Sequence, residues 1–336
     1  MFPVPNIRSA KIQEADTLEH ELCDWQIESV QLTPGEFQLV TDRIVFADLV
    51  VERSRHNLAK KDDYRLPPNT TSLCLFKPGA RPGHWCGNEI PEDSILVNQS
   101  DTDHFAVLPD GYEHITILIS NELLSFWDLL PRHLNDADGT SQKSIIPLLG
   151  AFNSLFRDWL YSLFDKECQE RLASSPNIEN KFREQLHSGM MRLIDEGRAL
   201  QGDRVRTRRP ATHYGIVRRA CELIGDRIEE NLTTTVMASE LSVNVRSLQR
   251  AFIDVVGITP SQYVQVAKLR SVRQILRDNG CTKTTVSQVA IQHGFTELGR
   301  FSVRYRKMFG ESPSRTLRNG PRVFAVDSTG NRKLLN

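Results

Sequence analysis

Two stretches of the chain, VMASELSVNVRSLQRAF (residues 236–252) and VSQVAIQHGFTELGRFSVRYRKMFG (residues 286–310), repeat one pattern. Each begins with a short helix in which a small residue, Ala238 or Ala290, lets a second helix cross closely. A turn follows, and then a longer helix with large apolar side chains on one face. The repeat predicts two helix-turn-helix units. An ordinary helical hairpin is the alternative, and it explains one such stretch more readily than two.

The apolar positions of both stretches are expected to form the cores of these units. At the turn of the second unit, Gly294 supplies the positive φ that a tight helix end needs. In the first unit, Asn244 can cap the second helix. The expected core residues are Ala238, Leu241, Leu248, Phe252, Ala290, Gly294, Phe295, Phe301, Tyr305 and Phe309.

The segment between the units reads as one helix from Pro260 to Arg277, because proline suits a first helical turn and apolar residues then recur on one face. At about 1.5 Å per residue this helix spans roughly 27 Å. Two recognition helices on such a spacer can lie one turn of B-DNA, about 34 Å, apart. A single chain can then place two recognition helices in successive major grooves, as a helix-turn-helix dimer does.

The outer face of the first recognition helix is suited to reading bases. Leu248 and Phe252 face inward, so the 100° step per residue places Arg246, Gln249 and Arg250 on the far side. Arginine can bind guanine O6 and N7 with two hydrogen bonds, and glutamine can do the same for adenine N6 and N7. We therefore expect these three side chains to read double-stranded DNA. The alternative is that they are ordinary solvated helix residues.

The second recognition helix carries fewer groups that can read bases. Gly299 and Val303 lie on its outer face, so we expect little readout beyond a contact of Val303 with a thymine methyl group. The cations of this helix are expected to bind phosphates, which fix position without conveying sequence. They are Arg300, Arg304, Arg306 and Lys307.

The formal net charge of zero conceals two halves of opposite sign. Residues 1–202 hold 19 Lys and Arg against 31 Asp and Glu, whereas residues 203–336 hold 23 against 11. The basic half is the part expected to bind nucleic acid. The chain has no apolar run of signal-peptide or membrane-helix length, and its 6 cysteines form no CxxC pair. We expect a cytoplasmic protein with reduced thiols and no membrane contact.

Short apolar runs such as RIVFADLVVE (residues 43–52), separated by turn formers, occupy the region from Phe37 to Ile119 and predict an antiparallel barrel or sandwich. Helical periodicity follows as far as Leu200. The expected fold class is therefore α+β, an N-terminal antiparallel β-barrel with helices followed by an all-α domain. The expected parts are residues 1–200 for effector sensing, a linker at 201–215, a DNA-binding domain at 216–318 with helix-turn-helix units at about 235–256 and 286–309, and a tail at 319–336.

LQRAF (residues 248–252), GITPSQYVQVAKLRSVRQIL (257–276) and VSQVAIQHGFTELGRFSVRYRKMFGESPSRTLR (286–318) closely resemble the DNA-binding domain of the AraC/XylS family. The resemblance implies that Arg246, Gln249 and Arg250 read bases. It also implies a cupin-like sensory domain, transcriptional activation and RNA polymerase as a partner.

Two departures from the family pattern are visible. Ser242 stands where the family usually has glycine, and Gly299 and Val303 stand where polar or arginine side chains are frequent.

The acidic half loosely resembles the sensory domains of the branch that includes ethanolamine-operon regulators. The resembling residues are Trp25, Gln31, Leu32, Pro34, Gly35, Glu36, Phe37, Trp85, Cys86 and Gly87. The expected partners are promoter DNA and a small-molecule effector whose binding residues the sequence does not name. A homodimer formed through the apolar stripes of residues 145–200 is a further expectation, although packing of these helices on the barrel is an equal alternative.

Candidate metal ligands in the strand-rich region are His84, Glu89, His104 and His114. They would suit a rival reading of the chain as a metal-dependent cupin enzyme joined to a DNA-binding domain. Their spacing lacks the paired HxH of a cupin metal site, so we expect no metal, cofactor or catalytic residue. A second rival reading is a DNA-binding protein that responds to no ligand.

Overall fold

The structure is a computed structural model. It describes residues 6–13, 15, 25–77, 79, 81–129, 145–148, 150–174, 178–201, 211–278, 284–319, 324–326 and 332–334. The chain divides into two compact units. Met1–Ser29 and Gln38–Pro210 form the first, here called the sheet unit, and Val30–Phe37 and Ala211–Asn336 form the second, the helical unit.

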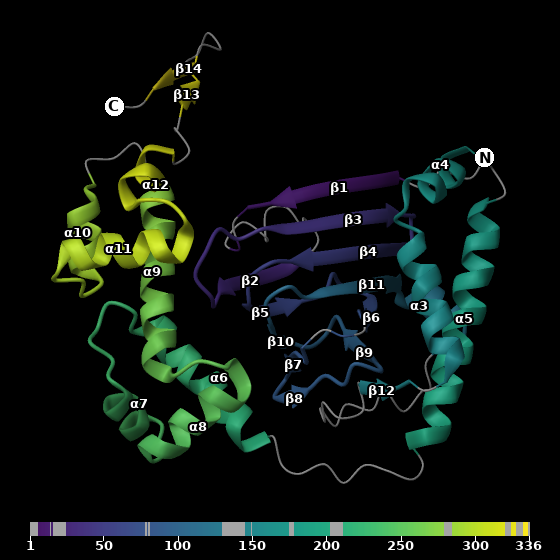
Figure 1. Cartoon of the computed structure of the whole chain (residues 1–336), viewed down its shortest axis with the longest axis horizontal. Helices are drawn as coiled ribbons and strands as arrows, with labels where there is room; N and C mark the ends of the chain where they lie inside the picture. Colours follow the sequence, from purple (N-terminus) through teal and green to yellow (C-terminus); the bar gives the residue numbers. More distant parts are fainter. Residues whose placement is uncertain are drawn as a thin grey trace. The chain divides into compact units, whose positions relative to one another are not determined.

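Antiparallel strands form two sheets (Figure 1). Their bounds are β1 (Asn6–Ile12), β2 (Gln26–Gln31), β3 (Leu39–Val45), β4 (Leu49–His56), β5 (Lys60–Arg65), β6 (Thr70–Phe76), β7 (His84–Trp85), β8 (Asn88–Glu89), β9 (Ser94–Gln99), β10 (His104–Leu108), β11 (Glu113–Ser120) and β12 (Ile145–Pro147). The larger sheet has seven strands in the order β1-β3-β4-β11-β6-β9-β12. The smaller has five, in the order β2-β5-β10-β7-β8.

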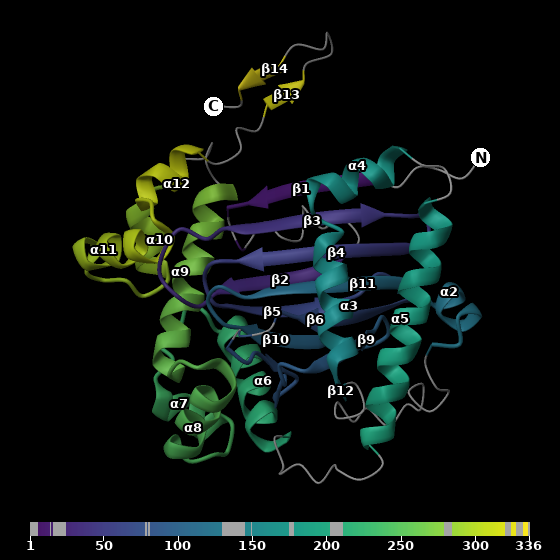
Figure 2. The same cartoon turned by 45° about the vertical axis from the view of Figure 1, so that its right-hand side comes forward.

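Helices cover one face of the seven-stranded sheet. Their bounds are α2 (Asn121–Phe126), α3 (Ala151–Ser162), α4 (Lys166–Ser174) and α5 (Ile178–Gln201). In Figure 2, α3 and α5 lie across β4 and β11. Phe156, Leu160 and Leu186 of these helices belong to one buried core with Val51 and Ile117 of the sheet. The sheet unit therefore places helices on one side of its larger sheet.

The other face of the larger sheet packs against the smaller sheet. Phe76 of β6 and Leu96 of β9 pack there with Trp85 of β7 and Leu108 of β10 in a second core. Because alternate residues of a strand point to opposite faces, one strand can serve both cores. Leu75 belongs to the helix-facing core and its neighbour Phe76 to the core between the sheets. This second layer encloses the pocket described below.

The expected α+β class is confirmed, but the expected barrel is not closed. A barrel needs every edge strand to hydrogen-bond to another strand. Within the described residues, β1 and β12 end the larger sheet and β2 and β8 end the smaller one. The run RIVFADLVVE is also two strands instead of one. The chain reverses in it, with the Phe46 N–H donating to the Leu49 carbonyl at 2.8 Å and Val45 pairing with Val50.

The helical unit contains seven described helices. Their bounds are α6 (Ala211–Asp226), α7 (Thr234–Glu240), α8 (Val245–Val256), α9 (Pro260–Asp278), α10 (Val286–Gln292), α11 (Leu298–Phe309) and α12 (Pro313–Asn319), followed by the paired strands β13 (Phe324–Val326) and β14 (Arg332–Leu334). No helix in the described part of the chain is long and apolar enough to cross a membrane.

Side-chain caps fix where three of these helices begin. Thr233 accepts from the Val236 N–H at α7, and Asn244 accepts from the Ser247 N–H at α8 at 2.7 Å, as the sequence predicted. At α10, Thr285 and Gln288 form a reciprocal capping box. Each cap satisfies backbone donors that the first helical turn leaves without a partner.

Candidate nucleic-acid interface

In the first helix-turn-helix unit, a short turn over residues 241–244 joins α7 to α8. Ser242 adopts φ 54°, a conformation that favours glycine, and its N–H donates to the Ser239 carbonyl at 3.0 Å. The Val243 N–H donates to the Ala238 carbonyl at 2.9 Å. Ser242 therefore makes this turn at the cost of backbone strain.

The inner face of α8 is tightly packed, which fixes the direction of its outer face. Leu248 and Phe252 are fully buried, and the Phe252 ring lies 5.6 Å from that of Tyr263 on α9 in an edge-to-face arrangement. Such aromatic pairs add to the stabilisation from apolar burial. Because α8 cannot rotate without opening this core, the side chains on its far side project from a rigid support.

The outer face of α8 carries the three side chains expected to read bases. Arg246, Gln249 and Arg250 are exposed. Arg250 lies near Asp254, with 3.8 Å between Nε and Oδ2. Asp254 also contacts Nδ1 of His213 at 2.9 Å. An exposed ion pair of this length contributes little to stability, so Arg250 can leave Asp254 for a stronger acceptor.

In the second unit, α10 and α11 are joined by a turn at Gly294. This residue has φ 81°, and the Phe295 N–H that follows it donates to the Ala290 carbonyl at 2.9 Å. A Cβ at Gly294 would also lie 3.2 Å from Nζ of Lys268. Backbone conformation and space therefore both favour glycine here.

Aromatic side chains hold α11 against the rest of the helical unit. Ring centroids are 4.9 Å apart for Phe295 and Phe301, 5.7 Å for Phe301 and Tyr305, and 4.8 Å for Tyr305 and Phe309. The buried Tyr305 hydroxyl donates to Oγ1 of Thr316 on α12 at 2.8 Å. The inward stripe of α11 is thus as well anchored as that of α8.

The outer face of α11 differs from that of α8. Val303 is 69% exposed, and nothing lies within 4 Å of the position that a Cβ would occupy at Gly299. Arg300 pairs with Glu297 at 2.9 Å and remains exposed. The other expected phosphate-binding residues, Arg304, Arg306 and Lys307, are also exposed. This face combines a short apolar patch with surrounding cations.

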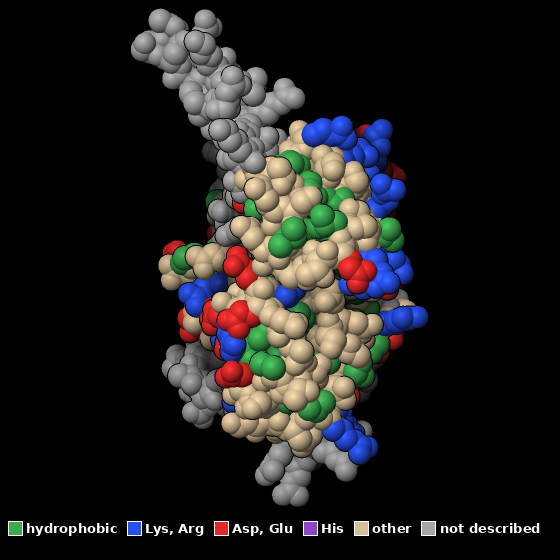
Figure 3. Space-filling model, turned by 90° about the vertical axis from the view of Figure 1, so that its left-hand side faces the viewer, with side chains coloured by type: hydrophobic (Ala, Val, Ile, Leu, Met, Phe, Trp, Pro, Cys, Tyr) green, Lys and Arg blue, Asp and Glu red, His purple; other side chains and the backbone are tan. Residues whose placement is uncertain are grey.

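The structure separates the expected site residues into two sets. Every expected core residue is buried except Gly294, which is an exposed turn residue. Every residue expected to contact bases or phosphates is exposed. Lys and Arg side chains gather along one edge of the face drawn in Figure 3, with apolar side chains beside them.

A buried lysine that the sequence analysis missed links the two helix-turn-helix units. Lys268 of α9 is 6% exposed, and its Nζ donates to the Glu230 carbonyl before α7 at 2.8 Å and to the His293 carbonyl after α10 at 3.0 Å. Burial lowers the pKa of this ammonium group. The sequence signal for this lysine is its position four residues after Val264, next to Leu269, on the face of α9 that carries most of the apolar residues.

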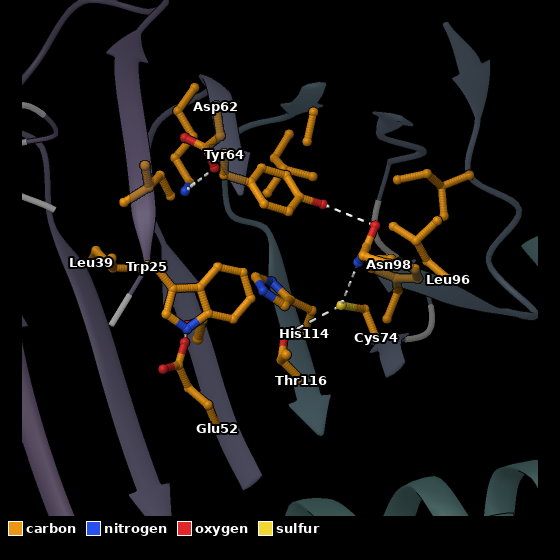
Figure 4. A pocket seen from close by; sticks show the side chains of 17 residues that line it. Trp25, Leu39, Glu52, Asp62, Tyr64, Cys74, Leu96, Asn98, His114 and Thr116 are labelled. Carbon is orange, nitrogen blue, oxygen red and sulfur yellow. Dashed lines mark hydrogen bonds and ion pairs between the residues drawn. The ribbon is translucent and has the colours of Figure 1, made fainter. Parts of the chain in front are cut away.

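The sheet unit holds a pocket between its two sheets (Figure 4). It has a volume of about 90 Å³ and is lined by residues from β2 to β6 and β9 to β11. Lys60, Asp62 and Tyr64 of β5 contribute alternate side chains. This period of two is the sequence signal that would have identified them, but the charged string KKDDYR did not look like a strand.

The candidate metal ligands do not assemble. Within the described residues, no group of three or more His, Cys, Asp or Glu side chains could hold a metal ion. His84 and Glu89 face each other across the β7–β8 pair, while His104 Nε2 lies 2.8 Å from the Gln99 carbonyl. His114 lines the pocket.

Comparison with known proteins agrees with the geometry of the helical unit. Residues 237–319 match the model of a helix-turn-helix domain. The chain is 35% identical over 100 residues to a XylDLEGF operon transcriptional activator of Pseudomonas putida, covering 30% of this chain and 31% of that protein. It is 31% identical over 152 residues to the probable thc operon regulatory protein of Rhodococcus erythropolis, covering 45% of each.

One solved structure is similar in sequence to about a third of this chain. It is a probable AraC family transcriptional regulator from Rhodopseudomonas palustris CGA009, with 33% identity over 32% of this chain and 99% of that one and a TM-score of 0.30. The chain belongs to the AraC/XylS family of DNA-binding transcription regulators. The matched segment spans about a third of the Pseudomonas putida activator, so membership of the AraC/XylS family rests on the helical unit.

Proposed function

We propose that this chain is a sequence-specific transcription regulator that reads two successive major grooves with α8 and α11. The proposal rests on one observation: each of these helices has a buried inner face and an exposed outer face. Leu248 and Phe301 are buried on the inner faces, whereas Arg250 and Val303 project from the outer ones. A rigid helix with a buried stripe and an exposed arginine face is the arrangement that major-groove readout requires.

We propose different roles for the two recognition helices: α8 mainly reads bases and α11 mainly binds phosphates. Arg246, Gln249 and Arg250 of α8 supply hydrogen bonds to base edges, and Val303 of α11 supplies an apolar contact to a thymine methyl group. Arg300, Arg304, Arg306 and Lys307 bind phosphates and so fix the register of α11 on the duplex. Specificity is then concentrated in the half of the site that α8 contacts.

We further propose that residues 1–200 form an effector-sensing, cupin-like part, that residues 216–318 bind DNA, and that the chain activates transcription in contact with RNA polymerase. The names of the relatives support this, since the Pseudomonas putida proteins are operon activators. The pocket between the sheets supports a sensory role over an enzymatic one, because each of its ionised groups is already in an ion pair, Glu52 with Arg43 and Lys60 with Asp62. A homodimer of the chain is compatible with this scheme.

The test is a selection of binding sites by the full chain from a pool of random duplexes. A selected site should bind at least about 10³-fold more tightly than random duplex at the same salt concentration. Equal affinity for selected and random duplexes would overturn the proposal, since phosphate contacts alone produce binding without specificity.

A further inference from the structure

Residues 31–37, QLTPGEF, carry part of the pattern that resembles the sensory domains of the family, yet they belong to the helical unit. They comprise the end of β2 and the connection to β3, whereas the rest of the helical unit begins at Ala211. Gln31 and Leu32 are buried, at 3% and 5% exposed. We call Val30–Phe37 the docking segment, because it is a distant part of the chain that packs within the helical unit.

The docking segment is hydrogen-bonded to one carbonyl group of α11. Gln31 Nε2 donates to the Met308 carbonyl at 2.8 Å, and the Gly35 N–H donates to the same oxygen at 3.1 Å. Gln31 Nε2 also donates within the segment, to the Thr33 carbonyl at 2.8 Å and the Gly35 carbonyl at 2.9 Å. Because all three acceptors are carbonyl oxygens, only the NH2 group of the Gln31 amide can face them. One side chain thus folds the segment and attaches it to α11.

The Met308 carbonyl lies where a helix needs donors from outside. The last four carbonyl groups of an α-helix have no donor from the helix itself, and Met308 is the next-to-last residue of α11. The C-cap Gly310 supplies its N–H to the Arg306 carbonyl at 2.8 Å. The Met308 carbonyl receives its two donors from the docking segment. The segment therefore completes the end of α11, as side-chain caps complete the starts of α7, α8 and α10.

The first recognition helix ends in the same backbone conformation but in a different environment. Its C-cap, Gly257, has φ 81°, and Gly310 at the end of α11 has φ 74°. Nothing lies within 4 Å of the position that a Cβ would occupy at Gly257, whereas a Cβ at Gly310 would overlap with the side chain of Glu36. The docking segment therefore lies against the end of α11, and the end of α8 at Gly257 is open.

The turn of α11 to which the segment is attached carries two exposed cations, Arg306 and Lys307. Helix ends fray, and a cation on an ordered backbone loses less conformational entropy when it binds a phosphate. We propose that Gln31 is a positioning residue for DNA binding: through the docking segment it orders the last turn of α11 and so holds Arg306 and Lys307 in place for the phosphates. The inference rests on the proposed function, in which these two cations bind the DNA backbone.

The test is the affinity of the full chain for a selected DNA site over a series of salt concentrations, because the slope of log affinity against log salt reports the number of phosphate contacts. Gln31→Met removes the side-chain donor and should make the slope shallower by about one, with the base preferences assigned to α8 unchanged. Gln38→Met, at an exposed glutamine just after the segment, is the matched control and should keep the wild-type slope. An unchanged slope in Gln31→Met, or equal changes in both variants, would overturn the inference.

A combined variant separates positioning from a general loss of stability. If Gln31 acts through Arg306, then Gln31→Met and Arg306→Gln together should lower the slope by less than the sum of the two single changes. Additive changes would contradict the positioning role. A lower slope in Arg306→Gln with an unchanged one in Gln31→Met overturns this inference alone. An unchanged slope in Arg306→Gln overturns the phosphate role of that arginine, and the inference with it.

A second set of variants covers the case in which Gln31→Met fails to fold. Gly310→Ala places a Cβ against the Glu36 side chain and should also make the slope shallower. Gly257→Ala imposes similar backbone strain in open space and should keep the wild-type slope. Adding Glu36→Ala to Gly310→Ala removes the overlapping atoms and should restore most of the slope. If it does not, strain at residue 310 accounts for the change, and the docking segment has no part in holding the cations of α11.

Discussion

Leu248 and Arg250 lie two positions apart on α8 and face opposite ways, one fully buried and one exposed. Arg250→Ala removes a pair of donors without opening the core, so the free energy of unfolding should change by no more than about 0.5 kcal/mol. Affinity for the selected DNA site should fall by about 1 to 3 kcal/mol, concentrated at one or two base pairs. Thermal unfolding and binding to single-base variants of the site measure both quantities.

Leu248→Ala is the matched variant and should behave in the opposite way. It leaves a cavity in a packed core and should cost about 2 to 5 kcal/mol of stability. Affinity for specific and random DNA should then fall together. A base-selective loss in Leu248→Ala, or equal behaviour of the two variants, would show that the wrong face of α8 has been assigned to DNA.

His114 makes the stability of the sheet unit depend on pH. Its pKa is about 4 in the folded chain and about 6.5 when unfolded, so the unfolded state binds more protons between these values. Stability is therefore complete above about pH 6.5 and declines as the pH falls toward 4, by on the order of 3 kcal/mol from this group. Urea unfolding followed by tryptophan fluorescence measures it, because all 4 tryptophans lie in the sheet unit.

The control for this pH dependence is His114→Gln, which removes the titrating group and keeps a polar side chain. The decline in the free energy of unfolding from pH 6.5 to 4 should be shallower in the variant. Parallel curves for the two proteins would mean that the imidazole of His114 is not held neutral by burial.

At the scale of elements, Lys268 of α9 joins the segment before the first helix-turn-helix unit to the turn between α10 and α11 of the second. Lys268→Met removes the donor to one buried and one part-buried carbonyl group and should cost about 1 to 3 kcal/mol of stability. It should also reduce the preference for the selected spacing between the two halves of the DNA site, measured with sites lengthened or shortened by one base pair. Gln265→Met, an exposed change on the same helix, is the control. If Lys268→Met keeps the wild-type spacing preference, the ammonium group of Lys268 does not fix the spacing between the two units.

The cations of α11 are expected to act on phosphates. Arg300→Gln or Arg306→Gln should weaken binding to all sequences about equally and reduce the slope of log affinity against log salt by about one. Arg192→Gln is a suitable control, since Arg192 is an exposed, paired arginine of α5 in the sheet unit. A changed base preference in either α11 variant would instead assign that arginine to base reading.

Sequence patterns predicted helices α8 and α11 but missed strand β5, and the difference has a physical cause. The stripes of α8 and α11 repeat with helical periodicity around large apolar residues, and they were recognisable. Strand β5 was missed because its inward residues include Lys60 and Asp62, whose burial is stabilised by their ion pair and by a hydrogen bond from Ser29 to Asp62. The pairing partner of a buried charge is a property of the fold, so composition alone predicts a loop there.

The link at Lys268 also needed three-dimensional information. The turn at Ser242 did not, because the family resemblance marks its position as one usually held by glycine, and the structure gives Ser242 φ 54°. The pocket was anticipated only in a general way, since its lining comes from strands far apart along the chain.

At the scale of the whole molecule, the charge separation along the chain agrees with a division of roles. The acidic residues 1–202 are unsuited to a polyanion, while residues 203–336 carry the basic excess. The pocket between the two sheets lies in the sheet unit, and α8 and α11 lie in the helical unit. A ligand can regulate DNA binding across such a division only if it binds two states of the chain with different affinity.

We propose that one chain reads two major grooves with two recognition helices. This is tested most directly by the affinity of the full chain for a selected site in which each base pair is changed in turn, repeated with Arg250→Ala. We expect two blocks of sensitive positions about 10 base pairs apart, centre to centre, bound by one chain. We also expect that Arg250→Ala flattens the stronger block and leaves the other unchanged. A single sensitive block, or two blocks that Arg250→Ala weakens equally, would contradict the proposal.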